Sequence, residues 1–334
     1  MFNPLISVII PSYNQSEFLE ETILSIINQN YEYKEIIVID GGSIDNSIEI
    51  IKKHESSIKY WISEKDSGQT EAINKGFKVA SGEIVNWICS DDILTPGALS
   101  IVASHFQKNK TIDVLYGNTQ LFKDNFSSEN VLLISKIDLA FDRDRGIGKI
   151  ITPQPSTFFK REILNKLGYL DEKLNFGMDY DLYLRIACNN YNFIGISDIL
   201  AYYRLHTNSK TATSTKKFYA DWNYSFTRFI NSVEDNETYI KILKEVELYT
   251  KGAGLIQITS KFTKEQVCKS ICYHISNGIN HHYENLNFQY VRRITSQTRR
   301  LCPKIYFELK LYKFDVVAIL LPIPLVKILR KILR

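Results

Sequence analysis

The sequence predicts a Rossmann-like α/β fold followed by a mainly helical region, and three observations support this. Up to about Gly117, short β-branched runs alternate with amphipathic stretches at helical spacing, as in βαβ units. Each apolar run in this part ends in a cluster of small polar residues. From about Lys216 to the end the pattern is helical, with no internal repeat and no low-complexity tract.

Four short apolar runs are predicted to be strands. They are rich in isoleucine and valine, and each is followed by turn-forming residues. Pro11 ends the first run. The four predicted strands are Ile6–Ile10, Ile36–Ile39, Ile58–Ile62 and Ile84–Cys89.

Three helices are predicted between these strands. Ser16 is predicted to cap the first, and Asp45 the second, because short polar side chains accept hydrogen bonds from free helix amides. The third spans Gln69–Ala80 and stops before Gly82. Apolar residues share one face of the first two helices: Leu19, Ile23, Ile26 and Ile27, then Ile48 and Ile51.

The polar clusters all follow the carboxyl ends of predicted strands. Open α/β sheets bind their ligands at that edge. Any single cluster is explained by turn chemistry, but four of them on one edge indicate a site. They are Ser12-Tyr13-Asn14, Asp40-Gly41-Gly42, Glu64-Lys65-Asp66 and Ser90-Asp91-Asp92.

The adjacent pair Asp91 and Asp92 is the strongest candidate within these clusters. Two carboxylates this close repel each other and raise each other's pKa, so a cation, hydrogen bonds or solvent must compensate them. Mg²⁺ or Mn²⁺ would do so with oxygen ligands. A solvated turn that caps the next helix also explains the pair, so both interpretations stay open at this point.

Composition indicates a soluble globular protein of one or two domains, since 44% of its 334 residues are hydrophobic and 23% are charged. The cysteine count of five is odd, and Cys268 and Cys272 have helical rather than metal-knuckle spacing. No signal peptide is recognised after Met1. These features predict a cytoplasmic protein.

The C-terminal end is basic although the net charge is only +4. Its last residues combine an apolar stripe at helical spacing with a basic face, which fits an anionic membrane surface better than nucleic acid. Packing against the protein's own body is the alternative. The uncharged run Val316–Val326 is too short to span a bilayer. The stripe is Leu325, Ile328, Leu329 and Ile332, and the face is Lys327, Arg330, Lys331 and Arg334.

The segment from Thr119 to about Ile151 is predicted to be irregular, because it is charged and holds the loop-like run Asp142–Gly146. The boundary between two predicted halves, about 1–118 and about 119–215, is placed there. Together these halves form a predicted domain, 1–215, and residues 216–334 form the helical region with its basic tail.

Four motifs together resemble the family 2 glycosyltransferases. They are Ser7–Asn14, Ile37–Asp45, Glu64–Gly76 and Ser90–Asp92, matching in order and spacing within roughly residues 5–210. The resemblance implies an inverting transferase that uses nucleotide-diphosphate sugars, with 1–215 as its catalytic domain, about 1–118 as the donor half and about 119–215 as the acceptor half. It also implies the A-type glycosyltransferase fold, which has a mixed central sheet.

The resemblance further implies roles for individual residues. The nucleotide-sugar would be bound by residues of the four motifs, and a divalent cation, Mn²⁺ or Mg²⁺, would neutralise the departing diphosphate. Asp92 would hold the cation, together with His206 of the element Arg204-Leu205-His206, which could instead contact the diphosphate. The predicted donor-binding residues are Pro11, Tyr13, Asn14, Asp40, Asp66, Gln69, Asn74 and Asp91.

Asp179 is the expected general base, because the run Gly177–Arg185 resembles the family's acidic motif at the start of a helix. Most relatives carry Glu where this chain has Met178. Capping of the helix is the other role open to Asp179. Asp181 is predicted to be structural, paired with Arg185 one turn later.

Other functions are weighed on the same residues. A dinucleotide oxidoreductase would need Gly-x-Gly-x-x-Gly where this chain has Pro11–Asn14, so that function is excluded. A nucleotidyltransferase of related fold stays open, and so does an inactive relative that binds nucleotide or glycan. The predicted activity is hexosyl transfer in cell-surface polysaccharide synthesis. The expected acceptor is a glycan or lipid-linked glycan, nucleic acid is not an expected partner, and the expected location is the cytoplasm or the inner face of the membrane.

Overall fold

A computed structural model describes the chain except for residues 1–2, 125–129, 208, 211–213, 285–286 and 321–334. The chain divides into two compact units, each considered separately below. Unit 1 comprises residues 1–141, 151–182 and 190–221, and unit 2 comprises residues 142–150, 183–189 and 222–334.

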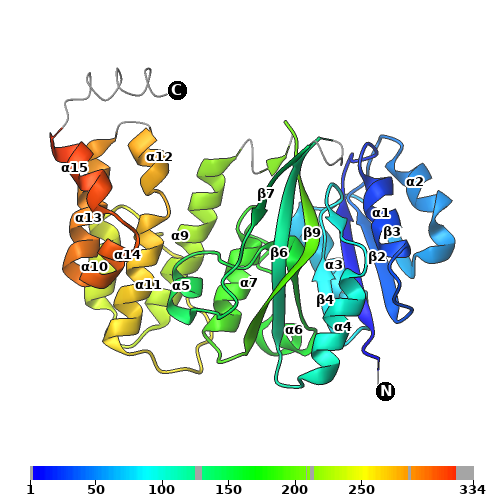
Figure 1. Cartoon of the computed structure of the whole chain (residues 1–334), viewed down its shortest axis with the longest axis horizontal. Coiled ribbons are helices and arrows are strands. Elements are labelled where there is room, and N and C mark those ends of the chain that lie inside the picture. The colour runs from blue at the N-terminus through cyan, green and yellow to red at the C-terminus, as the bar shows by residue number, and fades with distance from the viewer. Residues whose placement is uncertain (1–2, 125–129, 208, 211–213, 285–286, 321–334) are drawn as a thin grey trace. The chain divides into compact units, whose positions relative to one another are not determined.

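Unit 1 is built on one mixed sheet (Figure 1). Among the described residues its strand order is β3-β2-β1-β4-β8-β6-β9-β5, with β7 paired to β6. This confirms the predicted mixed α/β architecture. The strands are β1 (Ile6–Ser12), β2 (Lys34–Asp40), β3 (Tyr60–Ser63), β4 (Ile84–Trp87), β5 (Ile93–Leu94), β6 (Val114–Lys123), β7 (Val131–Ser135), β8 (Thr157–Lys160) and β9 (Phe193–Leu205).

The four strands β3, β2, β1 and β4 are parallel, so their carboxyl ends lie at one edge. Ser12 at the end of β1 pairs with Asp40 at the end of β2, and Asp40 pairs with Ser63 at the end of β3. β4 continues directly into the segment with Asp91 and Asp92. The register therefore brings the predicted polar clusters to a common edge.

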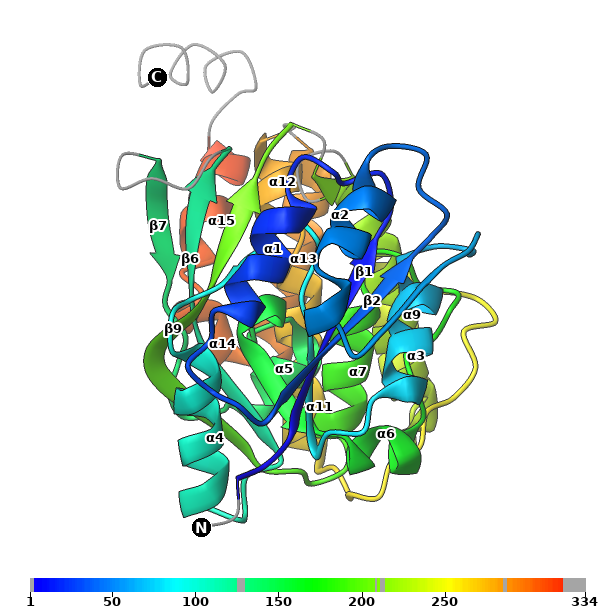
Figure 2. The same cartoon turned by 90° about the vertical axis from the view of Figure 1, so that its right-hand side faces the viewer.

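Helices cover both faces of this parallel part (Figure 2). Alternate residues of β1 point to opposite faces. Val8 belongs to the core that contains α1, α2 and α4, whereas Ile9 contacts α3 at Gly76. A Cβ on Gly76 would lie 2.4 Å from Cγ2 of Ile9, so glycine permits this close packing. The helices of unit 1 are α1 (Leu19–Ile27), α2 (Ser47–Lys53), α3 (Gln69–Val79), α4 (Ala98–Lys108) and α6 (Glu162–Leu167), with short 3-10 helices at Glu55–Ser57 and Gln154–Ser156.

The prediction that residues 119–151 are irregular is wrong. β6 runs to Lys123 and β7 pairs antiparallel with it. Polar residues of β6 such as Gln120 are partly exposed while Phe122 is buried. A strand that is half exposed needs few apolar residues, which is why composition alone suggested a loop.

Ser16 does not cap the first helix. The structure places the start of α1 at Leu19, with Phe18 before it and no side-chain cap. The backbone N–H of Ser16 instead donates to Asp45 Oδ2 at 2.9 Å. Asp45 also accepts from the backbone N–H of Ser47 at 3.0 Å, but the N-cap residue of α2 is Asn46, which makes no side-chain cap, so the predicted cap at Asp45 is wrong and Asp45 instead ties two loops together.

Helix α7 (Met178–Ala187) begins in unit 1 and ends in unit 2. α9 (Thr215–Ser232) likewise starts in unit 1. The predicted division between residues 215 and 216 therefore falls at the start of a continuous helix, and the assignment of catalysis to residues 1–215 stays a prediction.

Unit 2 is helical, as predicted for the C-terminal region. Phe226, Phe229 and His274 are buried in its core, where the rings of Phe226 and His274 stack at 3.9 Å. Burial lowers the pKa of His274 to about 3, so this imidazole is neutral. Besides parts of α7 and α9, the unit contains α5 (Arg143–Gly148), α10 (Glu237–Glu245), α11 (Lys264–Ser276), α12 (Ile279–Glu284), α13 (Phe288–Leu301), α14 (Pro303–Glu308) and α15 (Tyr312–Leu320).

Two predictions for the C-terminal end concern the membrane. The amphipathic stripe at residues 325–332 lies outside the described residues. Within the part of the chain that the structure covers, no helix is both long enough and apolar enough to cross a bilayer.

Candidate active site

A cleft of about 710 Å³ opens at the carboxyl ends of the parallel strands, entirely within unit 1. Its walls come from β1, from the loops after β2 and β3, from the start of α3 and from the segment after β4. Residues near the start of α7 and after β9 complete it. Of the predicted site residues, it brings together Pro11, Tyr13, Asp66, Gln69, Asp91 and Asp92.

Asp92 is the most buried of the carboxylates that line the cleft. Its side chain is 1% exposed, and its Oδ1 accepts a 2.9 Å hydrogen bond from the backbone N–H of Arg204. Its Oδ2 is buried and has no hydrogen-bond partner in the part of the chain that is described. Burial raises the pKa of Asp92, and the neighbouring charge of Asp91 raises it further.

This arrangement fits a cation. One ligand atom each from Cys89, Asp91 and Asp92 lies within 4.8 Å of the others. A buried carboxylate oxygen without a partner is costly unless something neutralises it. The carboxylate oxygens of Asp91 and Asp92 suit Mg²⁺ or Mn²⁺. Burial, then the two carboxylates, raise the pKa of the Cys89 thiol, which makes the neutral thiol a poor metal ligand.

Arg204 holds this acidic segment from β9. Its guanidinium donates from Nε to the backbone oxygen of Asp91 at 2.7 Å and also bonds the backbone oxygen of Asp124 and the carboxylate of Glu21. The rings of Phe18 and Phe122 lie 4.5 and 4.6 Å from its central carbon. The fully buried guanidinium therefore fixes the backbone that presents the two aspartates.

His206 lies beside Asp91. Its Nε2 is 3.0 Å from Asp91 Oδ2, and its ring packs 4.9 Å from that of Phe18. It does not line the cleft. The structure therefore places His206 at the acidic pair, while its predicted role as a metal ligand stays a prediction.

Asp40 lies below the cleft rather than in its wall. It is fully buried, and its oxygens accept hydrogen bonds from the backbone N–H groups of Gly42 and Ser43 and from the hydroxyls of Ser43 and Ser63. These bonds fix the loop after β2. The predicted contact of Asp40 with base or ribose stays a prediction.

Asp66 packs on that same loop and faces the cleft. A Cβ on Gly41 would lie 2.9 Å from Asp66 Oδ2, so only glycine permits this approach. Asp66 Oδ1 accepts from the backbone N–H of Gly68 at 2.9 Å. Burial raises the pKa of Asp66 despite this bond.

The predicted first donor-binding loop follows β1. Tyr13 is 61% exposed at the cleft, so its ring is free to meet a ligand. Asn14 has a positive φ of 51°. Its backbone N–H donates to Ser43 Oγ at 2.7 Å, and its Oδ1 accepts from the N–H of Ile44 at 2.9 Å. Asn14 therefore joins two loops and does not line the cleft.

Asn74 also lies behind the site. Its amide exchanges two hydrogen bonds with the backbone of Leu170, each 3.0 Å long, and bonds Glu172 at 2.9 Å. Asn74 is buried and does not line the cleft. It attaches α3 to the segment that leads toward α7.

Asp179 lies in the first turn of α7 and does not line the cleft itself. Desolvation raises its pKa to about 6, partly offset by hydrogen bonds from backbone N–H groups, including a 2.7 Å bond from Tyr180. Asn175 and Phe176, just before it, do line the cleft. The start of α7 therefore adjoins the pocket.

Several cleft residues were not predicted from sequence. Lys210 donates from Nζ to Gln69 Oε1 at 2.8 Å and to the backbone oxygen of Asn175 at 2.9 Å, which links the start of α3 to the turn before α7. Phe176 lies under this ammonium, 5.2 Å from ring to nitrogen. Lys210 is four residues beyond His206, and that proximity was the one signal available in the sequence.

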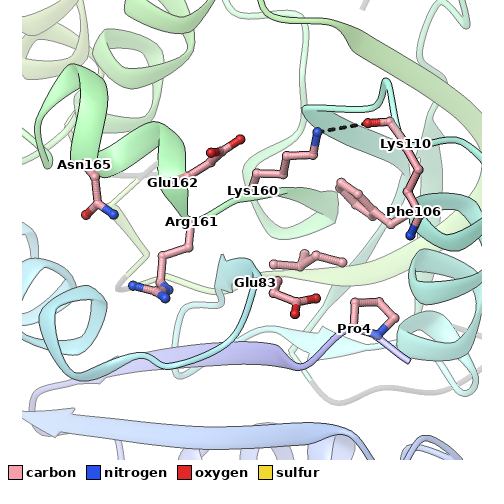
Figure 3. Close-up of a pocket in the computed structure, with 9 residues that line it drawn as sticks. Pro4, Glu83, Phe106, Lys110, Lys160, Arg161, Glu162 and Asn165 are labelled. Carbon is pink, nitrogen blue, oxygen red and sulfur yellow. Dashed lines mark hydrogen bonds between the residues drawn. The ribbon is translucent and has the colours of Figure 1, made fainter. Parts of the chain in front are cut away.

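A smaller hollow of about 350 Å³ lies where β1 and β4 begin, at the edge opposite to the cleft (Figure 3). Lys160 donates from Nζ to the backbone oxygen of Lys110 at 3.1 Å, and Arg161 donates from Nε to that of Gly82 at 2.7 Å. These basic groups join neighbouring loops. Because α/β sheets bind ligands at the carboxyl edge, the larger cleft is the candidate active site.

Comparison with known proteins agrees with this geometry. The family described as "Glycosyl transferase family 2" matches this chain over residues 7–168. An uncharacterized glycosyltransferase of Methanocaldococcus jannaschii is 31% identical over 222 residues, which are 65% of this chain and 76% of that protein. The chain belongs to the family 2 glycosyltransferases. It is therefore a glycosyltransferase, as the four motifs predicted.

Two further relatives of this family 2 glycosyltransferase are named more specifically. One is the UDP-Glc:alpha-D-GlcNAc-diphosphoundecaprenol beta-1,3-glucosyltransferase WfgD of Escherichia coli, 28% identical over 66% of this chain and 84% of that protein. The other is the poly-beta-1,6-N-acetyl-D-glucosamine synthase of Staphylococcus epidermidis, 29% identical over 50% and 42%. Both act in the synthesis of glycans.

Solved structures confirm the fold. The structure of S. aureus TarS 1-349 in complex with UDP-GlcNAc aligns with a TM-score of 0.60 at 16% identity, covering 90% of this chain and 82% of that one. The predicted A-type glycosyltransferase fold is thus confirmed, including the helical region that follows it.

Proposed function

We propose that this glycosyltransferase moves a hexose from a nucleotide-diphosphate sugar to a hydroxyl of a glycan or lipid-linked glycan, with inversion, in cell-surface polysaccharide synthesis. One observation supports this function most strongly. The cleft joins an exposed aromatic ring, Tyr13, to a buried carboxylate oxygen without a partner, that of Asp92. An aromatic face suits a nucleoside and an uncompensated carboxylate suits the cation that accompanies a diphosphate.

We propose UDP as the first nucleotide to test, because the E. coli relative is named for a UDP-sugar. Tyr13 would stack on the base, and Pro11, Asp66, Gln69 and Asp91 would line the rest of the donor site. Asp40, Asn14 and Asn74 would contribute to donor binding indirectly, because their side chains hold the loops that form the wall of the site.

Asp92 would hold a divalent cation, Mn²⁺ or Mg²⁺, with His206 as the second protein ligand. Support for this comes from the unpartnered Oδ2 of Asp92 and from the position of His206 beside Asp91. The cation would supply positive charge that stabilises the departing diphosphate. Arg204 would keep the acidic segment in place whether or not the cation is bound, because its guanidinium bonds the backbone there.

Asp179 would remove the proton from the acceptor hydroxyl as that oxygen attacks the anomeric carbon. A pKa of about 6 supports this role, because most of the carboxyl is ionised at neutral pH yet remains a useful base. The bond from the anomeric carbon to the diphosphate oxygen breaks as the new bond forms. The hydroxyl proton ends on Asp179, and the nucleoside diphosphate leaves.

The acceptor and the location are proposed from the same relative, whose name specifies a lipid diphosphate-linked sugar. We propose a similar acceptor here and a position at the cytoplasmic face of a membrane. Deletion of residues 312–334 tests the second part. The truncated chain should move from the membrane fraction to the soluble fraction, and unchanged sedimentation would contradict membrane association through the tail.

The nature of the products tests the reaction. The purified chain would be incubated with Mn²⁺ and a panel of nucleotide sugars, with and without lipid-linked glycan acceptors. Release of nucleoside diphosphate together with a longer glycan is expected. Release of pyrophosphate would indicate nucleotidyl transfer instead, and nucleotide binding without any product across the panel would indicate an inactive relative.

A further inference from the structure

Asp221 contacts the turn that carries the proposed base. It lies on α9, beyond residue 168 where the family match ends. Its Oδ2 accepts three hydrogen bonds from consecutive backbone N–H groups, those of Asn175 at 3.2 Å, Phe176 at 2.8 Å and Gly177 at 3.0 Å. All four residues belong to unit 1.

The three amides are those that precede α7. The backbone N–H of Asp181 donates to the oxygen of Gly177 at 3.0 Å, so the helix begins at this turn. Amides at a helix start have no partner within the helix, and a carboxylate there satisfies them and interacts favourably with the helix dipole. Gly177 is the N-cap residue of α7, so Asp221 satisfies from another helix the free N-cap amide and the two amides that precede it, and Asp179 lies two residues beyond Gly177.

The same turn is held from the opposite side. Thr70, near the start of α3, donates from Oγ1 to the backbone oxygen of Leu174. A Cβ on Gly68 would lie 2.5 Å from Asn175 Oδ1, so the turn packs directly on the backbone before α3. With α3 on one side and Asp221 on the other, residues 174–177 have little freedom.

We propose that Asp221 is a positioning residue for sugar transfer, fixing the turn 175–177 and thereby the direction in which Asp179 meets the acceptor. This inference rests on the proposed role of Asp179. It adds a residue that the family motifs do not contain. A displaced carboxylate would slow proton removal sharply, since alignment within about 1 Å governs such steps.

Asp221 also acts on Asp179 electrostatically. Desolvation is the larger cause of the raised pKa of Asp179, and the negative charge of Asp221 adds to it. Other charged groups near this turn are Lys210 and Lys217, whose ammonium groups lie 5.2 and 5.1 Å from the ring of Phe176. On α7 itself, Asp181 is buried.

Two variants separate these effects. Asp221→Asn keeps an oxygen that can accept the amide bonds but removes the charge, and Asp221→Ala removes both. Asp221→Ala should lower kcat about tenfold, with an unchanged KM for the donor, because the donor site is intact. Asp221→Asn should keep most of kcat and move the acidic limb of the kcat/KM profile to lower pH, because the pKa of Asp179 falls when the repulsion is removed.

A role in folding alone would lower the thermal midpoint of both variants without moving the acidic limb. That result, or a kcat for Asp221→Ala within twofold of wild type, would overturn the inference. Glu237→Gln is the matched control, because Glu237 is an exposed carboxylate in the first turn of α10. If Asp221→Ala does not fold, the pH profile of Asp221→Asn decides alone.

Asp179→Asn, measured alongside, separates the two proposals. Full activity in that variant would remove Asp179 as the base, and the inference with it. Loss of activity in Asp179→Asn combined with wild-type kcat and pH profile in both Asp221 variants would contradict only the inference.

Discussion

Asp92 and Asp179 are two desolvated carboxylates in unit 1, and their surroundings differ in a way that supports the separate functions proposed for them. Asp92 is beside a second carboxylate, Asp91, and retains a buried oxygen without a partner. Asp179 has no carboxylate next to it in the sequence, and its pKa is raised to about 6, mainly by desolvation and to a smaller extent by the charge of Asp221. Burial disfavours charge in both, and the second carboxylate beside Asp92 is the reason why we propose a cation at the acidic pair and none at Asp179.

The supports of the two regions also differ. The backbone around Asp91 and Asp92 is held by the guanidinium of Arg204, a cation. The turn before Asp179 is held by the carboxylate of Asp221, an anion. The first arrangement stabilises negative charge at the proposed site of the diphosphate. The second favours uptake of a proton, as the proposed role of Asp179 as general base requires.

The largest expected effect is on the base. Asp179→Asn keeps the shape of the side chain and removes its ability to accept a proton, so transfer should fall by about 10²- to 10⁴-fold. Binding of the nucleoside diphosphate should stay within about twofold, since Asp179 does not line the cleft. Turnover with a saturating acceptor measures the first quantity, and calorimetric titration measures the second. A fully active variant would assign the base elsewhere.

The next effect concerns the cation. Excess chelator should abolish transfer by the wild type, and Mn²⁺ or Mg²⁺ should restore it. Asp92→Asn should lose about 10²- to 10³-fold in kcat/KM, because a bound metal ion lowers the free energy of a charged transition state by several kcal/mol. Asp113→Asn, a partly exposed carboxylate paired with Lys160, is the control. Turnover that persists in excess chelator would contradict the metal assignment.

Arg204 should matter for stability. Arg204→Met keeps much of the packing between Phe18 and Phe122 but leaves the oxygens of Asp91 and Asp124 without their donor. The free energy of unfolding should fall by about 3 kcal/mol, as when one partner of a buried charged network is removed. Urea denaturation measures it. A loss below about 0.5 kcal/mol, the scale of ordinary surface substitutions, would show that β9 does not hold the acidic segment.

The smallest expected effect concerns the pH dependence of kcat/KM. Asp179 must be ionised to accept a proton, so activity is full above its pKa and is lost as pH falls through it. The kcat/KM profile should bend near pH 6 and fall about tenfold per pH unit below that value. Circular dichroism over the same range controls for unfolding. A bend near pH 4, the ordinary value for a carboxyl, would indicate that Asp179 is solvated in the working enzyme.

The sequence predicted the common edge of the sheet correctly, because parallel strands must end on the same side. Tyr13 and Asp66 reached the cleft for that reason. Motif position could not show which polar side chains face outward. Asp40 and Asn74 have the residue types of a binding site, yet their hydrogen bonds are made to neighbouring loops below it.

Other features depend on contacts between distant segments. In the sequence, Asp221 is one of several polar residues of a helix. Only the fold brings it against the turn before α7. Lys210 becomes part of the cleft only because β9 returns beside the acidic segment. Strand β6 was not predicted, because its partly exposed positions carry polar residues. Each of these is decided by tertiary packing, which a local pattern does not contain.

The effect of Mn²⁺ on nucleotide affinity in two variants tests most directly whether Asp92 and Asp179 have separate roles. UDP, GDP and TDP would be titrated into the wild type, Asp92→Asn and Asp179→Asn, each with and without Mn²⁺, and the tightest nucleotide compared. Mn²⁺ should increase affinity about tenfold or more in the wild type and in Asp179→Asn, and leave Asp92→Asn unchanged. An undiminished effect of Mn²⁺ in Asp92→Asn, or its loss in Asp179→Asn, would contradict the separate roles assigned to the two carboxylates.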